Sequence, residues 1–68
     1  MDYKSLIKRV LSESNGLRAE EIEIKIIKIA KNFYPPEKVD YLEFFTALQS
    51  MVNEGVLKRE KNKYFLNI

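Results

Sequence analysis

The feature that most constrains the fold is a change of hydrophobic period at Gly55. Before this glycine, apolar residues recur at intervals of three and four, which is typical of amphipathic helices. After it, apolar and polar residues alternate, which is typical of strands. Lys61-Asn62 divides this tail into two halves and predicts a two-residue hairpin loop, since Asn tolerates the positive φ that such a loop needs. The chain is therefore expected to combine helices with a C-terminal β-hairpin.

The predicted loop also fixes the register of the hairpin. Three cross-strand pairs are expected: Leu57 with Leu66, Arg59 with Tyr64, and Glu60 with Lys63. The last pair joins opposite charges, which favours this register. An isolated hairpin is only marginally stable, so we expect the face that carries Leu57 and Leu66 to pack against the helices.

Two amphipathic helices are predicted in the first half of the chain. The first covers residues 2–14, with Asp2 as its N-cap and Asn15-Gly16 as its stop. The second covers residues 19–33 and ends before Pro35-Pro36, because proline cannot continue the helical hydrogen bonds. Their apolar faces are expected to form much of the core: Tyr3, Leu6, Ile7, Val10, Leu11, Ile22, Ile26, Ile29, Ala30 and Phe33.

The third helix is predicted to run from Asp40 to Gly55. Asp40 and Glu43 form an Asp-x-x-Glu pattern, a variant of the capping box, directly before an apolar run. The apolar residues of this helix fall on one side and are expected to complete the core: Tyr41, Phe44, Phe45, Leu48, Met51 and Val52.

Composition limits how this core can be stabilised. A chain of 68 residues has a small core, and this one contains no Cys and no His. Disulfides and His/Cys metal sites are therefore excluded, which leaves packing and self-association. We expect a concentration-dependent homodimer and neither cofactor nor metal.

No segment of the sequence suggests secretion or a membrane partner. Met1-Asp2 lacks the basic start of a signal peptide, and no apolar run approaches the roughly 18 residues of a membrane span. The sequence predicts a soluble, intracellular, cytoplasmic protein.

The order of these elements resembles the winged helix-turn-helix family. The most characteristic part runs from Leu48 to Leu66, where a helix ends in Glu-Gly-Val-Leu and is followed by charged residues, a turn and an aromatic-aliphatic strand. The resemblance implies a mostly helical α+β winged-helix domain over residues 1–68, with a short first strand within Gly16–Arg18. It also implies that the third helix approaches the major groove of DNA while the hairpin, or wing, holds the backbone or the minor groove. Two features depart from the family pattern: the second helix is longer, and so is the linker over residues 34–39.

The wing carries the first candidate site. Its basic residues are Lys58, Arg59, Lys61 and Lys63. Such a cluster can neutralise phosphates and gain affinity by releasing counterions. The alternative is a solvated hairpin tip whose charges discourage edge-to-edge pairing of strands.

The polar side of the third helix carries the second candidate site. A stripe is formed by Leu42, Thr46, Gln49 and Asn53, with Ser50 alongside. Gln and Asn can make paired hydrogen bonds to adenine, and an apolar side chain can contact the thymine methyl group. This helix carries Asp40, Glu43 and Glu54 but neither Lys nor Arg, which disfavours approach to phosphates. The alternative interpretation is an ordinary solvated face.

Three apolar residues are candidates for binding a partner: Ile24, Ile27 and Leu42. Ile24 and Ile27 lie away from the main apolar face of the second helix. They are expected either to pack against the first helix in the core, which we favour, or to form an exposed apolar pair for a protein partner.

Catalysis is not expected. The serines have no His or Cys nearby to activate them, and the acidic residues suit the first turns of helices. The two glycines, Gly16 and Gly55, form no phosphate-binding loop, so we expect no small-molecule substrate. The leading functional hypothesis is a small transcriptional regulator that binds double-stranded DNA. The alternative is a protein-interaction module, an adaptor or subunit within a nucleic-acid-processing assembly.

Overall fold

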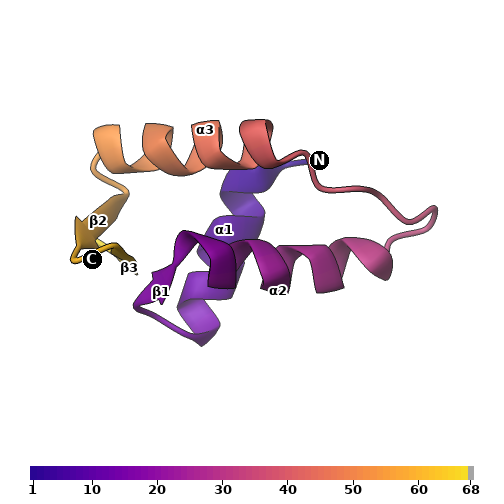
Figure 1. Ribbon diagram of the computed structural model, residues 1–68, viewed down its shortest axis with the longest axis horizontal. Coiled ribbons are helices and arrows are strands. Elements are labelled where there is room, and N and C mark those ends of the chain that lie inside the picture. Colours follow the sequence, from indigo (N-terminus) through magenta and orange to yellow (C-terminus); the bar gives the residue numbers. More distant parts are fainter. Residues whose placement is uncertain (68) are drawn as a thin grey trace.

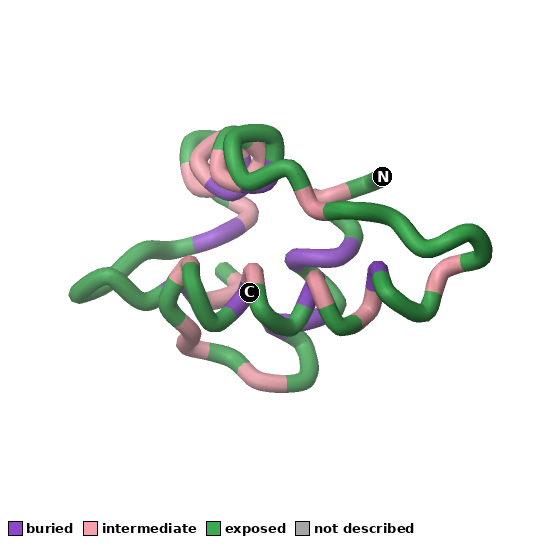
Figure 2. Tube along the Cα trace, turned by 45° about the vertical axis from the view of Figure 1, so that its right-hand side comes forward, coloured by how far each residue is buried: buried purple, intermediate pink, exposed green. Residues whose placement is uncertain are grey.

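The computed structural model describes residues 1–67 and contains three helices and three short strands (Figure 1). In chain order the elements are α1 (Tyr3–Glu13), β1 (Leu17–Arg18), α2 (Ala19–Lys31), α3 (Tyr41–Asn53), β2 (Leu57–Glu60) and β3 (Lys63–Leu66). Figure 2 views α3 almost end-on while α2 runs across the picture, so these two helices cross each other. No helix within residues 1–67 has the length and apolar character needed to span a bilayer. The α+β architecture predicted from the sequence is confirmed.

The ends of α1 form as predicted. The Asp2 side chain accepts a hydrogen bond of 3.2 Å from the backbone N–H of Ser5, which satisfies one of the unpaired donors of the first turn. After the helix ends at Glu13, Gly16 adopts a φ of 80°. Such a positive φ suits glycine, and it turns the chain directly into β1.

Helix α2 ends at Lys31, two residues before the predicted end at residue 33. The backbone N–H groups of Phe33 and Glu37 both donate to the Ala30 carbonyl, at 3.2 and 3.1 Å. The two donors lie on either side of Pro35, whose peptide bond to Tyr34 is cis. With both of them bound to Ala30, the chain turns away from the helix axis and folds back onto the helix end. The Ala30 carbonyl is thus satisfied by the linker rather than by a further helical turn.

Helix α3 is capped in a way that the sequence pattern did not fully predict. The Asp40 side chain accepts from the Glu43 N–H at 3.0 Å, as a capping box requires. The reciprocal bond is not made by Glu43, because the Asp40 N–H donates instead to the Tyr3 hydroxyl at 2.8 Å. The predicted capping box is therefore half correct, and α1 supplies the other half.

The three strands form an antiparallel sheet in the order β1-β3-β2. The three predicted cross-strand pairs are all present: Leu57 with Leu66, Arg59 with Tyr64, and Glu60 with Lys63. Lys61 and Asn62 both have positive φ, 50° and 66°, as a tight two-residue hairpin loop requires. The first strand expected from the family resemblance is present and pairs with β3.

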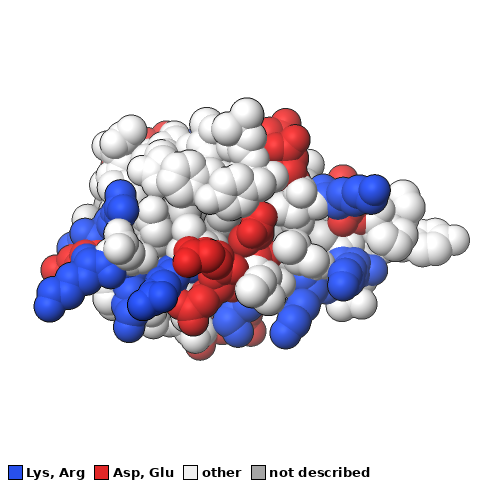
Figure 3. All heavy atoms as spheres, in the orientation of Figure 1, with Lys and Arg blue, Asp and Glu red and all other residues white. Residues whose placement is uncertain are grey.

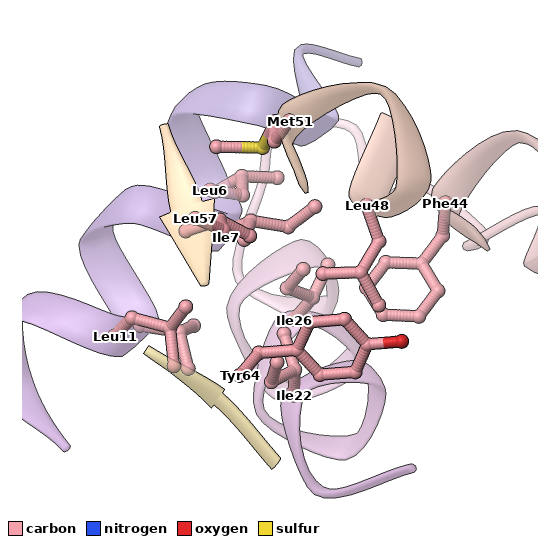
Figure 4. Packing of buried hydrophobic residues seen from close by; sticks show 11 residues of the cluster. Leu6, Ile7, Leu11, Ile22, Ile26, Phe44, Leu48, Met51, Leu57 and Tyr64 are labelled. Atoms are coloured by element: carbon pink, nitrogen blue, oxygen red, sulfur yellow. The ribbon is translucent and has the colours of Figure 1, made fainter. Parts of the chain in front are cut away.

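The core lies where the three helices meet the inner face of the sheet. Buried side chains from every helix and from both hairpin strands converge there (Figure 4). The cluster consists of Leu6, Ile7, Val10, Leu11, Ile22, Ile26, Phe44, Leu48, Met51, Leu57 and Tyr64. Buried stretches (purple in Figure 2) lie on the inner sides of the helices, and the hairpin tip is exposed. Leu66 packs against the cluster but is only half-buried.

The expectation that Ile24 and Ile27 belong to the core is wrong. Ile24 is 52% exposed, and Ile27 is half-buried outside the core cluster. One face of α2 fills the space between α1 and α3 with Ile22, Ile26 and Ala30. Ile29 packs against the cluster, whereas Ile24 and Ile27 are turned away from that face, because successive residues rotate by about 100°.

The order of the elements and of the strands is compatible with a winged-helix topology. Helices α2 and α3 take the places of the two helices of a helix-turn-helix, and β2 and β3 form the wing. The connection between α2 and α3 covers residues 32–40, much longer than the usual turn of about 3–4 residues.

Candidate nucleic-acid interface

The four basic residues predicted on the wing are all exposed: Lys58, Arg59, Lys61 and Lys63. In Figure 3, basic side chains (blue) gather at the left-hand end of the molecule, over the hairpin, whereas acidic side chains (red) gather over the start of α2 and further basic ones lie toward its end. Charge is thus unevenly distributed, and the wing is one of the basic ends.

The sheet adds a fifth cation to this end, which the sequence analysis missed. Strand β1 pairs with β3 so that Arg18 lies beside Lys63. Arg18 is exposed and 45 residues away from Lys63 in sequence, so only the sheet brings the two together. The expected first strand within Gly16–Arg18 was the one signal that could have revealed this. We call the five residues Arg18, Lys58, Arg59, Lys61 and Lys63 the wing surface.

The cations of the wing surface differ in how they are held. Lys58 lies 4.0 Å from the Glu60 carboxylate, which offsets part of its charge. Arg59 donates a hydrogen bond of 2.9 Å to the Asn62 side-chain oxygen, and its guanidinium carbon lies 5.8 Å from the centroid of the Tyr64 ring. Arg59 is therefore oriented by a side-chain amide and an aromatic ring, with no carboxylate of residues 1–67 at ion-pair distance. Within residues 1–67, neither Lys61, Lys63 nor Arg18 has an ion-pair partner.

The predicted stripe on α3 is only partly available. Thr46 and Asn53 are exposed, as is Leu42, but Gln49 and Ser50 are half-buried. The Gln49 amide donates to the Tyr64 hydroxyl at 3.1 Å. Base contacts from α3 could therefore come from Thr46 and Asn53, whereas the Gln49 amide nitrogen is already engaged.

One of the acidic residues of α3 is compensated by α1. The Lys4 ammonium lies 3.1 Å from the Glu54 carboxylate, and Glu54 also accepts a hydrogen bond of 3.4 Å from the Ser50 hydroxyl. The C-terminal end of α3 is therefore less repulsive to phosphates than the sequence suggests. At the other end, Asp40 and Glu43 remain exposed, so the N-terminal end is the acidic one.

A groove of about 350 Å³ lies beside the wing, between the start of α2, the N-terminal half of α3 and the hairpin. Its walls include Arg18, Glu20, Tyr41, Phe45, Arg59 and Tyr64. The rings of Tyr41 and Phe45 are stacked, with centroids 5.8 Å apart and planes inclined by 17°. We call this feature the aromatic groove. It joins aromatic rings to two guanidinium groups, a combination that the sequence analysis did not anticipate.

The three apolar residues proposed for partner binding do not form one site. Ile27 lines a separate cleft of about 440 Å³ with Pro36 and Val39, near the linker that follows α2. Ile24 and Leu42 do not line that cleft, and they are 52% and 73% exposed. Leu42 is the most exposed large apolar side chain on α3.

The described residues offer little to a metal ion. Within residues 1–67, no three acidic side chains gather closely enough to hold one.

Comparisons with protein-family models, with curated proteins and with solved structures find no match to this chain.

Proposed function

We propose that this chain is a DNA-binding winged-helix protein whose affinity comes from the wing surface. The observation that supports the proposal most directly is the pairing of β1 with β3, which adds Arg18 to the four cations of the hairpin. Only Lys58 among the five lies within ion-pair distance of a carboxylate in residues 1–67. Four cations without an ion-pair partner in residues 1–67, three on the strands and one in the hairpin loop, suit a polyanionic partner such as duplex DNA.

The wing, rather than α3, carries the electrostatic part of this function. Helix α3 has neither Lys nor Arg, and its N-terminal end carries Asp40 and Glu43. Phosphate contacts set the position of a protein on the duplex, and base contacts set its specificity. In this arrangement the wing surface provides the first kind of contact, and Thr46 and Asn53 of α3 are the residues for the second.

The test is a titration with mixed-sequence duplex DNA at two salt concentrations. In a Lys61→Ala/Lys63→Ala variant, affinity should fall for all sequences. The slope of log K against log salt should become less steep by about 0.9 for each phosphate contact removed. The matched control is Lys25→Ala/Lys28→Ala, which removes the same charge from the exposed side of α2. If both variants weaken binding equally, net charge rather than the wing is responsible. If the wild-type protein does not bind at low salt, the proposed function is wrong.

A second function, protein recognition through α3, is favoured by the exposed apolar side chains on the same helix. Leu42 is 73% exposed and Tyr41 is 53% exposed, and both stand beside the acidic Glu43. Covering such side chains would stabilise an interface by about 25 cal/mol for each Å² of apolar surface removed from water. Self-association is the simplest form of this function. Sedimentation equilibrium should then find a dimer that Leu42→Ser weakens and Lys28→Ser does not, whereas a monomer at high micromolar concentration would contradict it.

A further inference from the structure

We propose that the aromatic groove binds an unpaired nucleotide, so that the protein prefers a DNA duplex with a single-stranded extension over a blunt one. The inference deepens the proposed function and rests on it. It is carried by the aromatic rings and the Glu20 carboxylate of the groove, which the contacts of duplex backbone with the wing surface do not use. Arg18 and Arg59 belong to both surfaces.

The first feature of the groove that favours a nucleotide is the exposed ring of Tyr41. Tyr41 is 53% exposed even though it stacks on Phe45 and lies 6.1 Å, between ring centroids, from the buried Phe44. These contacts hold the ring in place while part of it stays open to solvent. Nucleobases stack on such aromatic platforms with little dependence on sequence, because every base has a π face.

The second feature is the pair of guanidinium groups that line the same groove, from Arg18 and Arg59. Arg59 is held by Asn62 and by the Tyr64 ring, so little side-chain entropy remains to be lost when it binds a phosphate. A guanidinium can donate two parallel hydrogen bonds to phosphate oxygens. The aromatic rings of the groove therefore suit the base of a nucleotide, and the adjacent guanidinium groups suit its phosphate.

The third feature is the carboxylate of Glu20, which disfavours binding of a ligand that carries only negative charge. Its side chain lines the groove and is exposed. A carboxylate repels phosphate but accepts hydrogen bonds from the amino groups of nucleobases. The groove therefore offers one wall to a base edge and another to the backbone. A bare phosphate or a sulfated chain would use only the arginine side.

The nucleotide must be unpaired to enter. Inside a duplex, both faces of a base are covered by its neighbours, and its pairing edge is occupied by its partner. Stacking on Tyr41 therefore requires a base that is already unstacked, as in a single-stranded extension. The volume of about 350 Å³ is at the lower end of the range for small-ligand sites, which suits one nucleotide rather than a longer segment.

The experiment compares two probes by fluorescence anisotropy: a blunt mixed-sequence duplex, and the same duplex with a short single-stranded extension. The wild-type protein should bind the extended probe at least about fivefold more tightly, the lower limit expected for stacking of one base. Tyr41→Leu should abolish this preference and leave the affinity for the blunt probe unchanged. Tyr41→Phe, which keeps the ring, should retain the preference. Circular dichroism of each variant verifies that it folds.

Leu42→Ala is the matched control, because Leu42 is the adjacent and more exposed apolar residue and does not line the groove. It should retain the preference for the extended probe. If the wild-type protein binds both probes equally, or if Tyr41→Leu weakens both alike, the nucleotide site is wrong while DNA binding by the wing surface stands. If neither probe binds at low salt, the proposed function itself fails and this inference fails with it.

Discussion

The side-chain amide of Gln49 donates a hydrogen bond of 3.1 Å to the hydroxyl of Tyr64, which joins α3 to the central strand of the sheet. The Tyr64 ring is buried in the core, so its hydroxyl is a fixed acceptor. A paired hydrogen bond to adenine would need both the oxygen and the nitrogen of the amide. Gln49 therefore positions α3 against the wing. In the function proposed above, its exposed neighbours Thr46 and Asn53 are then the residues for base contacts.

The strength of this bond can be measured by a double-mutant cycle. Tyr64→Phe and Gln49→Ala should each lower the free energy of unfolding by about 0.5–1.5 kcal/mol, since each leaves a partly buried polar group without its partner. The double variant should lose less than the sum of the two. Urea denaturation provides the measurement, with Asn53→Ala as an exposed control on the same helix that should change stability by less than about 0.5 kcal/mol. Strictly additive losses would mean that the bond contributes nothing.

Alanine substitutions at the two glycines should lower the free energy of unfolding by different amounts. Both have a positive φ, 80° at Gly16 and 78° at Gly55, so Ala at either position should cost about 1–2 kcal/mol for the left-handed backbone. A Cβ at Gly55 would meet nothing within 4 Å, whereas a Cβ at Gly16 would lie 2.7 Å from Cε2 of Phe65. Gly16→Ala should therefore destabilise the protein more than Gly55→Ala in chemical denaturation.

A second substitution separates the steric cost at Gly16 from the backbone cost. Combining Gly16→Ala with Phe65→Leu removes the ring atoms that the new methyl group meets. The loss caused by Gly16→Ala in the Phe65→Leu background should then approach the loss caused by Gly55→Ala. If the gap between the two glycines persists, close contact with Phe65 is not its cause.

Local patterns were sufficient to predict the three helices and the hairpin with its register, whereas β1 was expected only from the family resemblance. A two-residue loop fixes every cross-strand pair once its position is known, and Lys61-Asn62 was the position that matched opposite charges and apolar residues. The caps at Asp2 and Asp40 likewise depend on residues three positions away. Such short-range information is written directly in the sequence.

Contacts between distant residues were not predictable in the same way. The Tyr3 hydroxyl that completes the cap of α3 is 37 residues away from Asp40. Ile24 shows a related difficulty, because α2 carries more isoleucines than one face can bury. The packing of α1 and α3 decides which of them is covered, and single-helix periodicity does not contain that information.

In the candidate site, too, residues that are near in sequence were predictable and contacts between distant residues were not. The four cations of the wing are neighbours in sequence and were identified from it, whereas Arg18 joins them only through the pairing of β1 with β3. The Gln49 amide was predicted to be available for base contacts. Its bond to Tyr64 could not be foreseen, because that bond depends on how α3 crosses the sheet. The aromatic groove was missed for the same reason, since its walls come from α2, α3 and the hairpin.

The N-terminal cap of α1 should lose its stabilising contribution at acidic pH. The Ser5 hydroxyl donates to the Asp2 carboxylate at 2.7 Å, and this bond, followed by the one from the Ser5 N–H, lowers the pKa of Asp2 from its ordinary value of 3.8. Because the folded pKa is the lower one, the cap contributes stability above pH 3.8 and loses it as the pH falls below that value. Ser5→Ala should raise the pKa of Asp2 toward 3.8 in an NMR titration of the carboxyl group. Ser12→Ala is the control, since the Ser12 hydroxyl bonds to the Arg9 carbonyl and should leave Asp2 unaffected.

Within the wing surface, the ion pair between Lys58 and Glu60 predicts that cations contribute unequally to DNA binding. Lys58 lies 4.0 Å from the Glu60 carboxylate, so part of its charge is already offset, whereas Lys61 has no carboxylate partner within residues 1–67. Lys61→Ala should therefore reduce the salt slope by about 0.9, the value for one full phosphate contact, and Lys58→Ala should reduce it by less.

Glu60→Gln should increase the affinity of the wing for mixed-sequence duplex, because it releases Lys58 and removes a negative charge near the DNA backbone. Glu43→Gln removes the same charge from α3 and tests whether the gain is specific to the wing. Equal slopes for the two lysine variants, together with equal gains for the two glutamine variants, would show that binding depends on net charge and not on the arrangement of the wing.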